Sequence, residues 1–353
     1  SFRTSQDVPV HVALSQLNIT GNSAIYGGFL YVTGFSHTIT MERVSVSNNS
    51  ANINGGVFNL VVVTQMPSIV GDQVLTAFNS TFSGNSATHR GGSFVLSTFG
   101  PRNQTLNLTQ CNLTDGMASI GAVGLMITHF NGITQYLSLS DSRFIGNEAT
   151  DHGGVIDMIG ENDETQIIEV NHCLMDSNKA KEGGVITANI TGCQQVQFTN
   201  STWINNHADK NGGVGSFYAQ PTPFRDLGSL VLDGNTFQDN SAGASGGVLW
   251  FNQGRDVSLQ SNQWHNNSAE IQGGHLYLVL NSNTTGSIVS FTIANETFGN
   301  VSSGTESLYV SALVDVQLEV AGLSLESNPV KHVTLDGIAG TNNTLRISSL
   351  RTQ

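Results

Sequence analysis

A motif of about thirty residues recurs eleven times along the chain, and this repeat limits the folds that the chain can adopt. In one copy, Phe144 is followed by Asn147, by Ala149 and then by a Gly-Gly pair at 153. The asparagine positions of consecutive copies lie 27 to 36 residues apart, with a mean of 30.6 over the ten intervals from 22 to 328. The large apolar position is held in chain order by Ile19, Val46, Phe82, Leu113, Phe144, Met175, Trp203, Phe237, Trp264, Phe298 and Leu325.

Alternating apolar residues on both sides of the motif predict two strands in each copy. Before Phe144, the residues at distances of five and seven are Leu139 and Leu137. After the glycine pair, the second and fourth residues are Ile156 and Met158. A period of two residues is typical of a strand with one buried face, and no segment shows the period of a helix. The sequence therefore predicts an all-β fold.

A unit of this length cannot bury its own apolar face, but the next copy can cover it. We therefore predict a single-stranded, right-handed parallel β-helix, a solenoid of about eleven coils with roughly 30 residues per coil. It should form one continuous domain over residues 1–353, with degenerate coils from about 298. We expect Phe144 to stack between Leu113 and Met175. We also expect Asn147 to occupy a turn, with left-handed backbone angles, and to join a ladder of amides.

The repeat resembles that of the polymorphic outer membrane proteins of chlamydiae. The resemblance rests on the pattern F-x-x-N followed by G-G and a small or apolar residue, as in Phe237, Asn240 and Gly246-Gly247-Val248. It covers nearly the whole chain, although the usual G-G-A-I of that family is mostly Gly-Gly-Val here. The resemblance implies a parallel β-helix of the pectin-lyase-like kind, a cell-surface location and a role in adhesion.

The composition predicts an extracellular chain. Charged residues make up 11% of the sequence and the formal net charge is −13, which argues against binding nucleic acid or anionic membranes. No apolar run of 18 residues is present, so we expect no transmembrane segment in this chain. The sequence starts without methionine or a signal peptide, and we expect it to be a mature form or a segment.

Thirteen N-x-[S/T] sequons predict covalent N-glycans on a secreted eukaryotic protein. Most stand at positions that the strand alternation directs outward. The alternative is that asparagine-rich turns create the pattern by chance. The sequon asparagines are Asn18, Asn48, Asn79, Asn103, Asn107, Asn112, Asn189, Asn200, Asn266, Asn283, Asn295, Asn300 and Asn342.

The three cysteines leave the redox compartment undecided. Cys111 and Cys173 occupy the same repeat position two copies apart, with Ser142 between them, so about 10 Å should separate them. This distance is too long for a disulfide. We expect Cys193 to lie in a loop at a different position of the repeat.

The outward positions of the predicted strands show no cluster of acids, so we predict no catalytic residue, no metal ligand and no cofactor. The turns before the glycine pairs carry charges of alternating sign, such as Asp151 with His152 and Lys181 with Glu182. We expect these to form solvated ion pairs.

Trp250 and Tyr277 share one outward position on neighbouring coils and form a possible surface contact. Such a pair can stack on a sugar or contact a protein partner. Alternatively, the apolar loop that contains Phe217, Tyr218 and Phe224 covers it.

The chain contains whole coils without a polar cap at either end, which favours head-to-tail self-association. We therefore expect a non-enzymatic structural glycoprotein that is a subunit or segment of a cell-surface coat or filament. Two alternatives stay open: a cell-surface adhesin that binds glycans or proteins, and an enzyme similar to polysaccharide lyases or hydrolases.

Overall fold

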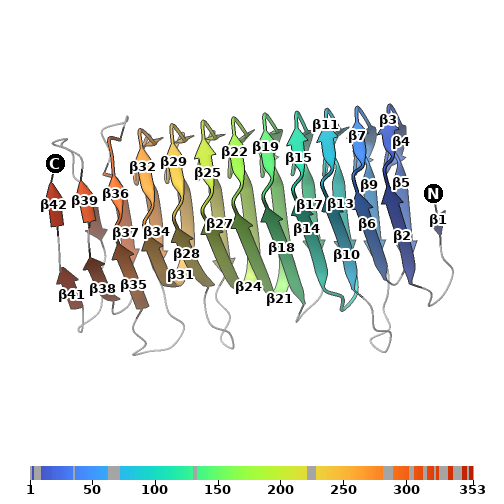
Figure 1. Cartoon of the computed structure of the whole chain (residues 1–353). Coiled ribbons are helices and arrows are strands. Elements are labelled where there is room, and N and C mark those ends of the chain that lie inside the picture. Colours follow the sequence, from blue (N-terminus) through green and yellow to red (C-terminus); the bar gives the residue numbers. More distant parts are fainter. Residues whose placement is uncertain are drawn as a thin grey trace.

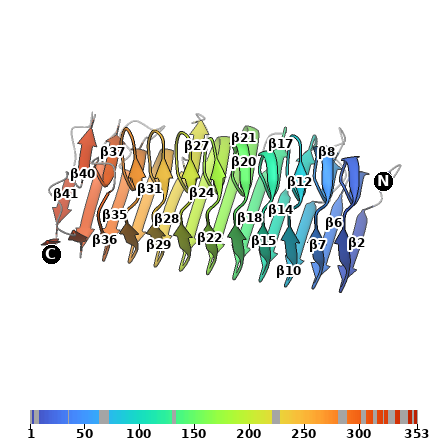
Figure 2. The same ribbon diagram turned by 90° about the horizontal axis from the view of Figure 1, so that it is seen from above.

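The chain folds into a parallel β-solenoid, as predicted. The computed structural model describes residues 2–3, 9–34, 36–62, 72–129, 133–220, 228–280, 289–301, 306–312, 316–321, 323–325, 333–336, 344–347 and 350–352. These residues form strands, turns and bends, and no helix occurs among them. The coils stack into an elongated rod with the two chain ends at opposite ends of it (Figures 1 and 2). The right-handed winding stays a prediction.

Three parallel sheets run along the rod. Sheet A contains 21 strands in the described residues: β1 (Phe2–Arg3), β2 (Val10–Ser15), β5 (Leu30–Gly34), β6 (His37–Glu42), β9 (Phe58–Val62), β10 (Gln73–Phe78), β13 (Phe94–Thr98), β14 (Gln104–Thr109), β17 (Gly124–Thr128), β18 (Thr134–Ser140), β21 (Ile156–Asn171), β24 (Ile186–Thr199), β27 (Gly215–Gln220), β28 (Gly228–Asp233), β31 (Leu249–Gln260), β34 (Leu276–Leu280), β35 (Val289–Ala294), β37 (Leu308–Ala312), β38 (Val316–Ala321), β40 (Val333–Asp336) and β41 (Thr344–Ile347).

The other two sheets consist of short strands. Sheet B contains 12 strands in the described residues: β3 (Asn18–Thr20), β7 (Ser45–Ser47), β11 (Thr81–Ser83), β15 (Asn112–Thr114), β19 (Arg143–Ile145), β22 (Leu174–Asp176), β25 (Thr202–Ile204), β29 (Thr236–Gln238), β32 (Gln263–His265), β36 (Thr297–Phe298), β39 (Leu323–Leu325) and β42 (Leu350–Thr352). Sheet C contains nine strands in the same residues: β4 (Ser23–Tyr26), β8 (Ser50–Asn54), β12 (Ser86–Ala87), β16 (Met117–Ile120), β20 (Glu148–His152), β23 (Lys179–Ala180), β26 (His207–Ala208), β30 (Ser241–Ala242) and β33 (Ser268–Ala269).

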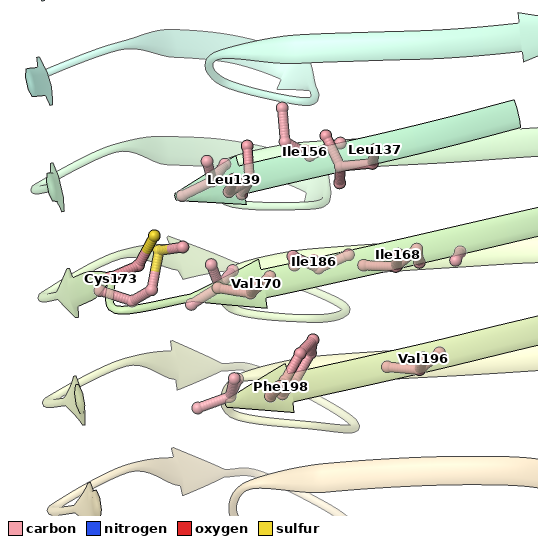
Figure 3. Close-up of a cluster of buried hydrophobic side chains, with 14 of the residues drawn as sticks. Leu137, Leu139, Ile156, Ile168, Val170, Cys173, Ile186, Val196 and Phe198 are labelled. Carbon is pink, nitrogen blue, oxygen red and sulfur yellow. The ribbon is translucent and has the colours of Figure 1, made fainter. Parts of the chain in front are cut away.

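The core is a set of columns in which equivalent side chains stack from coil to coil. Phe144 in β19 pairs in register with Leu113 in β15 and with Met175 in β22, and all three are fully buried. The predicted stacking is therefore confirmed. Burial of each such side chain contributes about 1.5 to 3 kcal/mol. Figure 3 shows the same arrangement in sheet A, where Leu139 precedes Val170 in one column.

Each of the first nine coils turns at three corners where the backbone is left-handed. In the coil that contains Phe144, the corner residues are Asp141, Gly146 and Gly153, with φ of 50°, 65° and 61°. The predicted left-handed angle at Asn147 is wrong by one residue. Gly146 makes the turn, and the next residue, Asn147, is fully buried. Asparagine, aspartate and glycine are common at such corners because they tolerate this conformation.

The buried asparagines form the predicted ladder. The side chain of Asn147 donates to Asn178 Oδ1 at 2.9 Å, and the series continues through Asn206, Asn240 and Asn267 with donor–acceptor distances of 2.9–3.0 Å. Each side chain also donates to a backbone carbonyl, as Asn178 does to Phe144 O at 2.9 Å. These bonds satisfy polar groups that the corner would otherwise leave unpaired in the core.

Two further interior ladders were not predicted. Five glutamines stack in sheet A with amide–amide distances of 2.8–3.0 Å, and all are fully buried; they are Gln73, Gln104, Gln135, Gln166 and Gln194. The second ladder is formed by residues that come directly after the first corner of their coils, and it includes Asn235 and Asn262. It reaches the buried carboxylate of Glu296, which accepts bonds from Asn262 and from Trp264 Nε1. Burial raises the pKa of Glu296 to about 7.

Candidate functional site

The outward face of sheet A brings polar and aromatic residues from successive coils into one column. In register, Asp157 of β21 is followed by Thr187 of β24, Ser216 of β27 and Trp250 of β31. This outward face is not fully exposed to solvent, since Asp157 retains only 1% of its accessible surface. Strand alternation predicts that these positions face outward, but it does not show which outward residues are covered.

A second outward column lies beside the first, two residues further along each strand. It contains Ile159, Asn189 and Tyr218, which pair in register. The two columns form a groove of about 320 Å³, a volume typical of a small-ligand site. The groove is lined by His152, Asp157, Ile159, Glu182, Thr187, Ala188, Asn189, Asn211, Ser216, Tyr218 and Trp250.

Asp157 is the most unusual polar group in this groove. Its Oδ1 accepts a hydrogen bond from the Thr187 hydroxyl, but its Oδ2 is buried and has no hydrogen-bond partner. Burial raises the pKa of Asp157 to about 6, while the Thr187 bond and the charge of His152 act in the opposite direction. A buried acceptor without a donor is costly, so a ligand that donates a hydrogen bond here would be stabilised.

The charged turns beside the groove form the expected ion pairs. Lys181 Nζ lies 3.5 Å from Asp151, and Lys210 Nζ lies 3.6 Å from Glu182. These side chains are partly or largely exposed, so each pair contributes under about 1 kcal/mol. However, His152 and Glu182 also line the groove with Asp157. This convergence is not visible in the sequence, because the groove combines outward strand residues with residues of the turns.

Trp250 and Tyr277 pair in register on neighbouring coils, as predicted, and their rings stack. Their ring centroids lie 6.4 Å apart with an interplanar angle of 12°. Tyr218 stacks on the other face of Trp250 at 6.3 Å, and Tyr309 stacks on Tyr277 at 4.9 Å. Trp250, Tyr277 and Tyr218 are all half-buried. They form an aromatic stripe that leads out of the groove.

The apolar loop that was the alternative prediction for covering Trp250 and Tyr277 lies only partly within the described residues. Phe217 points into the core, where it is fully buried, so it does not cover Trp250. Tyr218 does pack against Trp250 and belongs to the stripe itself. Phe224 lies outside the described residues.

The sequon asparagines lie at the surface. Of the eleven in the described residues, ten are exposed and Asn107 is half-buried. Asn79, Asn200 and Asn295 are left-handed residues at the first corner of their coils. Asn48 and Asn266 are left-handed at the second corner. Asn283 and Asn342 lie outside the described residues.

Two of the three cysteines belong to the hydrophobic core. Cys111 and Cys173 are buried and form no disulfide, as predicted from their separation. Burial raises the pKa of Cys111 to about 11 and that of Cys173 to about 12, so both thiols are protonated at neutral pH. Cys193 lies within β24 and not in the expected loop, because β24 runs without interruption into the next coil.

No family model, curated protein or solved structure matches the chain. Within the part of the chain that the structure describes, no helix is long and apolar enough to span a membrane. In the same residues, no group of three or more His, Cys, Asp or Glu side chains is placed to hold a metal ion.

Proposed function

We propose that this protein is a non-enzymatic, extracellular structural glycoprotein, a β-solenoid subunit or segment of a cell-surface coat or filament. The observation that carries this proposal is the continuous hydrophobic core, which extends from Ile19 to Leu323 through successive coils. A stack of this kind is suited to act as an elongated scaffold, because each coil is held by its two neighbours.

Exposure of the sequon asparagines supports the glycoprotein part of the proposal. A glycan needs an accessible acceptor, and corner residues such as Asn79 and Asn200 point away from the rod and are exposed. Intact mass before and after enzymatic deglycosylation tests this part, and an unchanged mass would refute it.

Self-association through coil ends is supported by the first coil. There, residues at core positions are uncovered: Leu17 and Phe29 retain 43% and 39% of their accessible surface. A further coil, from a second molecule or from the same polypeptide, would cover them. We expect filaments of the purified protein in electron micrographs, and we expect Leu17→Lys to reduce their length. The control is Ile271→Lys, which adds the same charge at a residue on the side of the rod that is 63% exposed. Equal assembly of both variants would refute end-on association.

A second candidate function is adhesion to carbohydrate, which the aromatic stripe favours. The half-exposed stripe presents a continuous apolar surface against which a sugar ring can pack. Binding of soluble oligosaccharides, followed through the fluorescence of Trp250, tests this function. Loss of binding in Trp250→Ala would support it.

The convergence of His152, Asp157 and Glu182 keeps a polysaccharide-active enzyme as a further alternative. Release of reducing ends or unsaturated products from acidic polysaccharides tests this alternative. Turnover that disappears in Asp157→Asn would overturn the non-enzymatic proposal.

A further inference from the structure

We infer that the groove on sheet A holds the innermost sugars of an N-glycan attached to Asn189. This inference rests on the proposed glycoprotein function and names the occupant of the groove. It assigns one of the sequons a structural role that the others do not share.

The position of Asn189 distinguishes it from the other described sequon asparagines. It lies within β24, on the outward face, and its exposed side chain lines the groove. Among the described sequons, no other asparagine lines this groove. By contrast, Asn79 and Asn200 stand at corners, where a glycan would extend into solvent. A glycan on Asn189 would therefore start inside the groove.

The aromatic residues beside Asn189 fit a sugar ring. Tyr218 is the in-register neighbour of Asn189 on the next coil, and Trp250 stacks parallel to Tyr218 with an interplanar angle of 11°. Both rings are half-buried and line the groove. Tyr218 and Tyr277 stack on the two faces of Trp250. The apolar C–H face of a sugar ring would therefore pack on the face of Tyr218 that is turned to the coil of Asn189.

The polar residues of the groove fit the hydroxyl edge of the same ring. Asp157 lines the groove, and its Oδ2 is buried and has no hydrogen-bond donor. A sugar hydroxyl would supply the missing hydrogen bond. Ser216 and Asn211 add further polar groups on the wall of the groove. A ligand with one apolar face and hydroxyl groups at its edge satisfies both the stripe and Asp157.

Attachment to the protein favours this glycan over a saccharide from solution. A tethered group has an effective concentration in the millimolar range, so weak stacking and a few hydrogen bonds are enough to hold it. Its attachment point is itself part of the groove wall, so the glycan would block entry of an external chain. The groove is then a packing site for the protein's own sugar.

Tryptophan fluorescence tests this inference directly. The chain has three tryptophans, and Trp203 and Trp264 are fully buried, so collisional quenchers report mainly on Trp250. The fully glycosylated protein is digested in its folded state with a peptide N-glycosidase. We expect the emission to shift to longer wavelength and to become easier to quench with acrylamide.

Two variants locate the effect. Thr191→Ala removes the sequon but leaves Asn189 in place, and we expect it to reproduce the red shift before any digestion. Thr191→Ser keeps the sequon and should behave as the wild type. Removal of a remote glycan by Thr81→Ala, which affects the sequon of Asn79, should leave the emission unchanged.

Glycopeptide mapping separates the possible outcomes. If no site carries a glycan, the proposed function fails. If other sites are occupied but Asn189 is not, only the present inference fails. If Asn189 is occupied and its deglycosylation leaves Trp250 emission unchanged, the inference is also overturned. If added oligosaccharide shifts the emission of the fully glycosylated protein, the groove takes an external ligand instead.

Discussion

Replacement of Asn206 by alanine should destabilise the solenoid strongly, because this residue occupies the middle of the asparagine ladder. Its Oδ1 accepts hydrogen bonds from the backbone and side-chain amides of Asn178, at 3.1 and 3.0 Å. Its Nδ2 donates to Met175 O at 3.0 Å and to Asn240 Oδ1 at 2.9 Å. The substitution removes all four bonds.

The size of the effect follows from the environment of these bonds. A net hydrogen bond contributes about 1 kcal/mol, and a buried group left without its partner costs about 1 to 3 kcal/mol. Asn206 and Asn178 have no accessible surface, so water cannot replace the lost bonds without opening the core. We expect Asn206→Ala to lower the free energy of unfolding by about 4 kcal/mol, a large share of a typical stability of about 5 to 15 kcal/mol.

Urea denaturation followed by far-ultraviolet circular dichroism measures this loss. The matched control is Asn52→Ala in β8, where the asparagine is exposed, and its effect should stay within about 0.5 kcal/mol. A loss below about 1 kcal/mol for Asn206→Ala would show that the ladder does not stabilise the fold. A loss of equal size in both variants would show that the effect does not depend on the ladder.

Three further predictions concern the corners, the pH response and the thiols. Gly154→Ala should lower the midpoint of thermal unfolding, because the added Cβ would lie 2.0 Å from the carbonyl oxygen of Gly184 on the next coil. An unchanged midpoint would contradict this close approach of the two coils. The pKa of Glu296 is raised from 4.5 to about 7 in the folded state, so its contribution to stability is present below pH 4.5 and is lost as the pH rises through 7. This contribution is about 3 kcal/mol. The urea midpoint of the wild type should therefore fall between pH 4.5 and 7, and Glu296→Gln should abolish this part of the fall. Cys111 and Cys173 should resist alkylation in the folded protein and react after unfolding, which mass spectrometry of the labelled peptides measures; rapid native labelling would contradict their burial.

The sequence alone determined the winding of the chain into stacked coils. The repeat and the alternation of apolar residues are local properties, and copies of one unit bury their faces only against each other. For the same reason, the neighbours of Phe144 and the asparagine ladder through Asn147 could be predicted. Equal positions in successive copies become contacts as soon as the coils stack in register.

The corner conformations and the second set of ladders needed the structure. Asn147 and Gly146 are adjacent, and the sequence pattern does not show which of them turns the chain. The glutamine ladder occupies only five coils, so it is weaker than the repeat as a sequence signal. Cys193 lies in β24 and not in a loop, and the sequence does not show that this return segment stays extended.

The candidate groove is formed only by the tertiary structure. Its residues come from sheet A, from the end of β20 in sheet C and from the turns that follow sheet C, and they lie on several coils. The outward positions of the repeat, compared one position at a time, do not reveal the groove. The convergence of Asp157, Asn189 and Trp250 depends on the register between coils and on which outward positions are covered. A repeated sequence thus fixes what each coil must bury, while the small differences between coils become a site only when the stack brings them side by side.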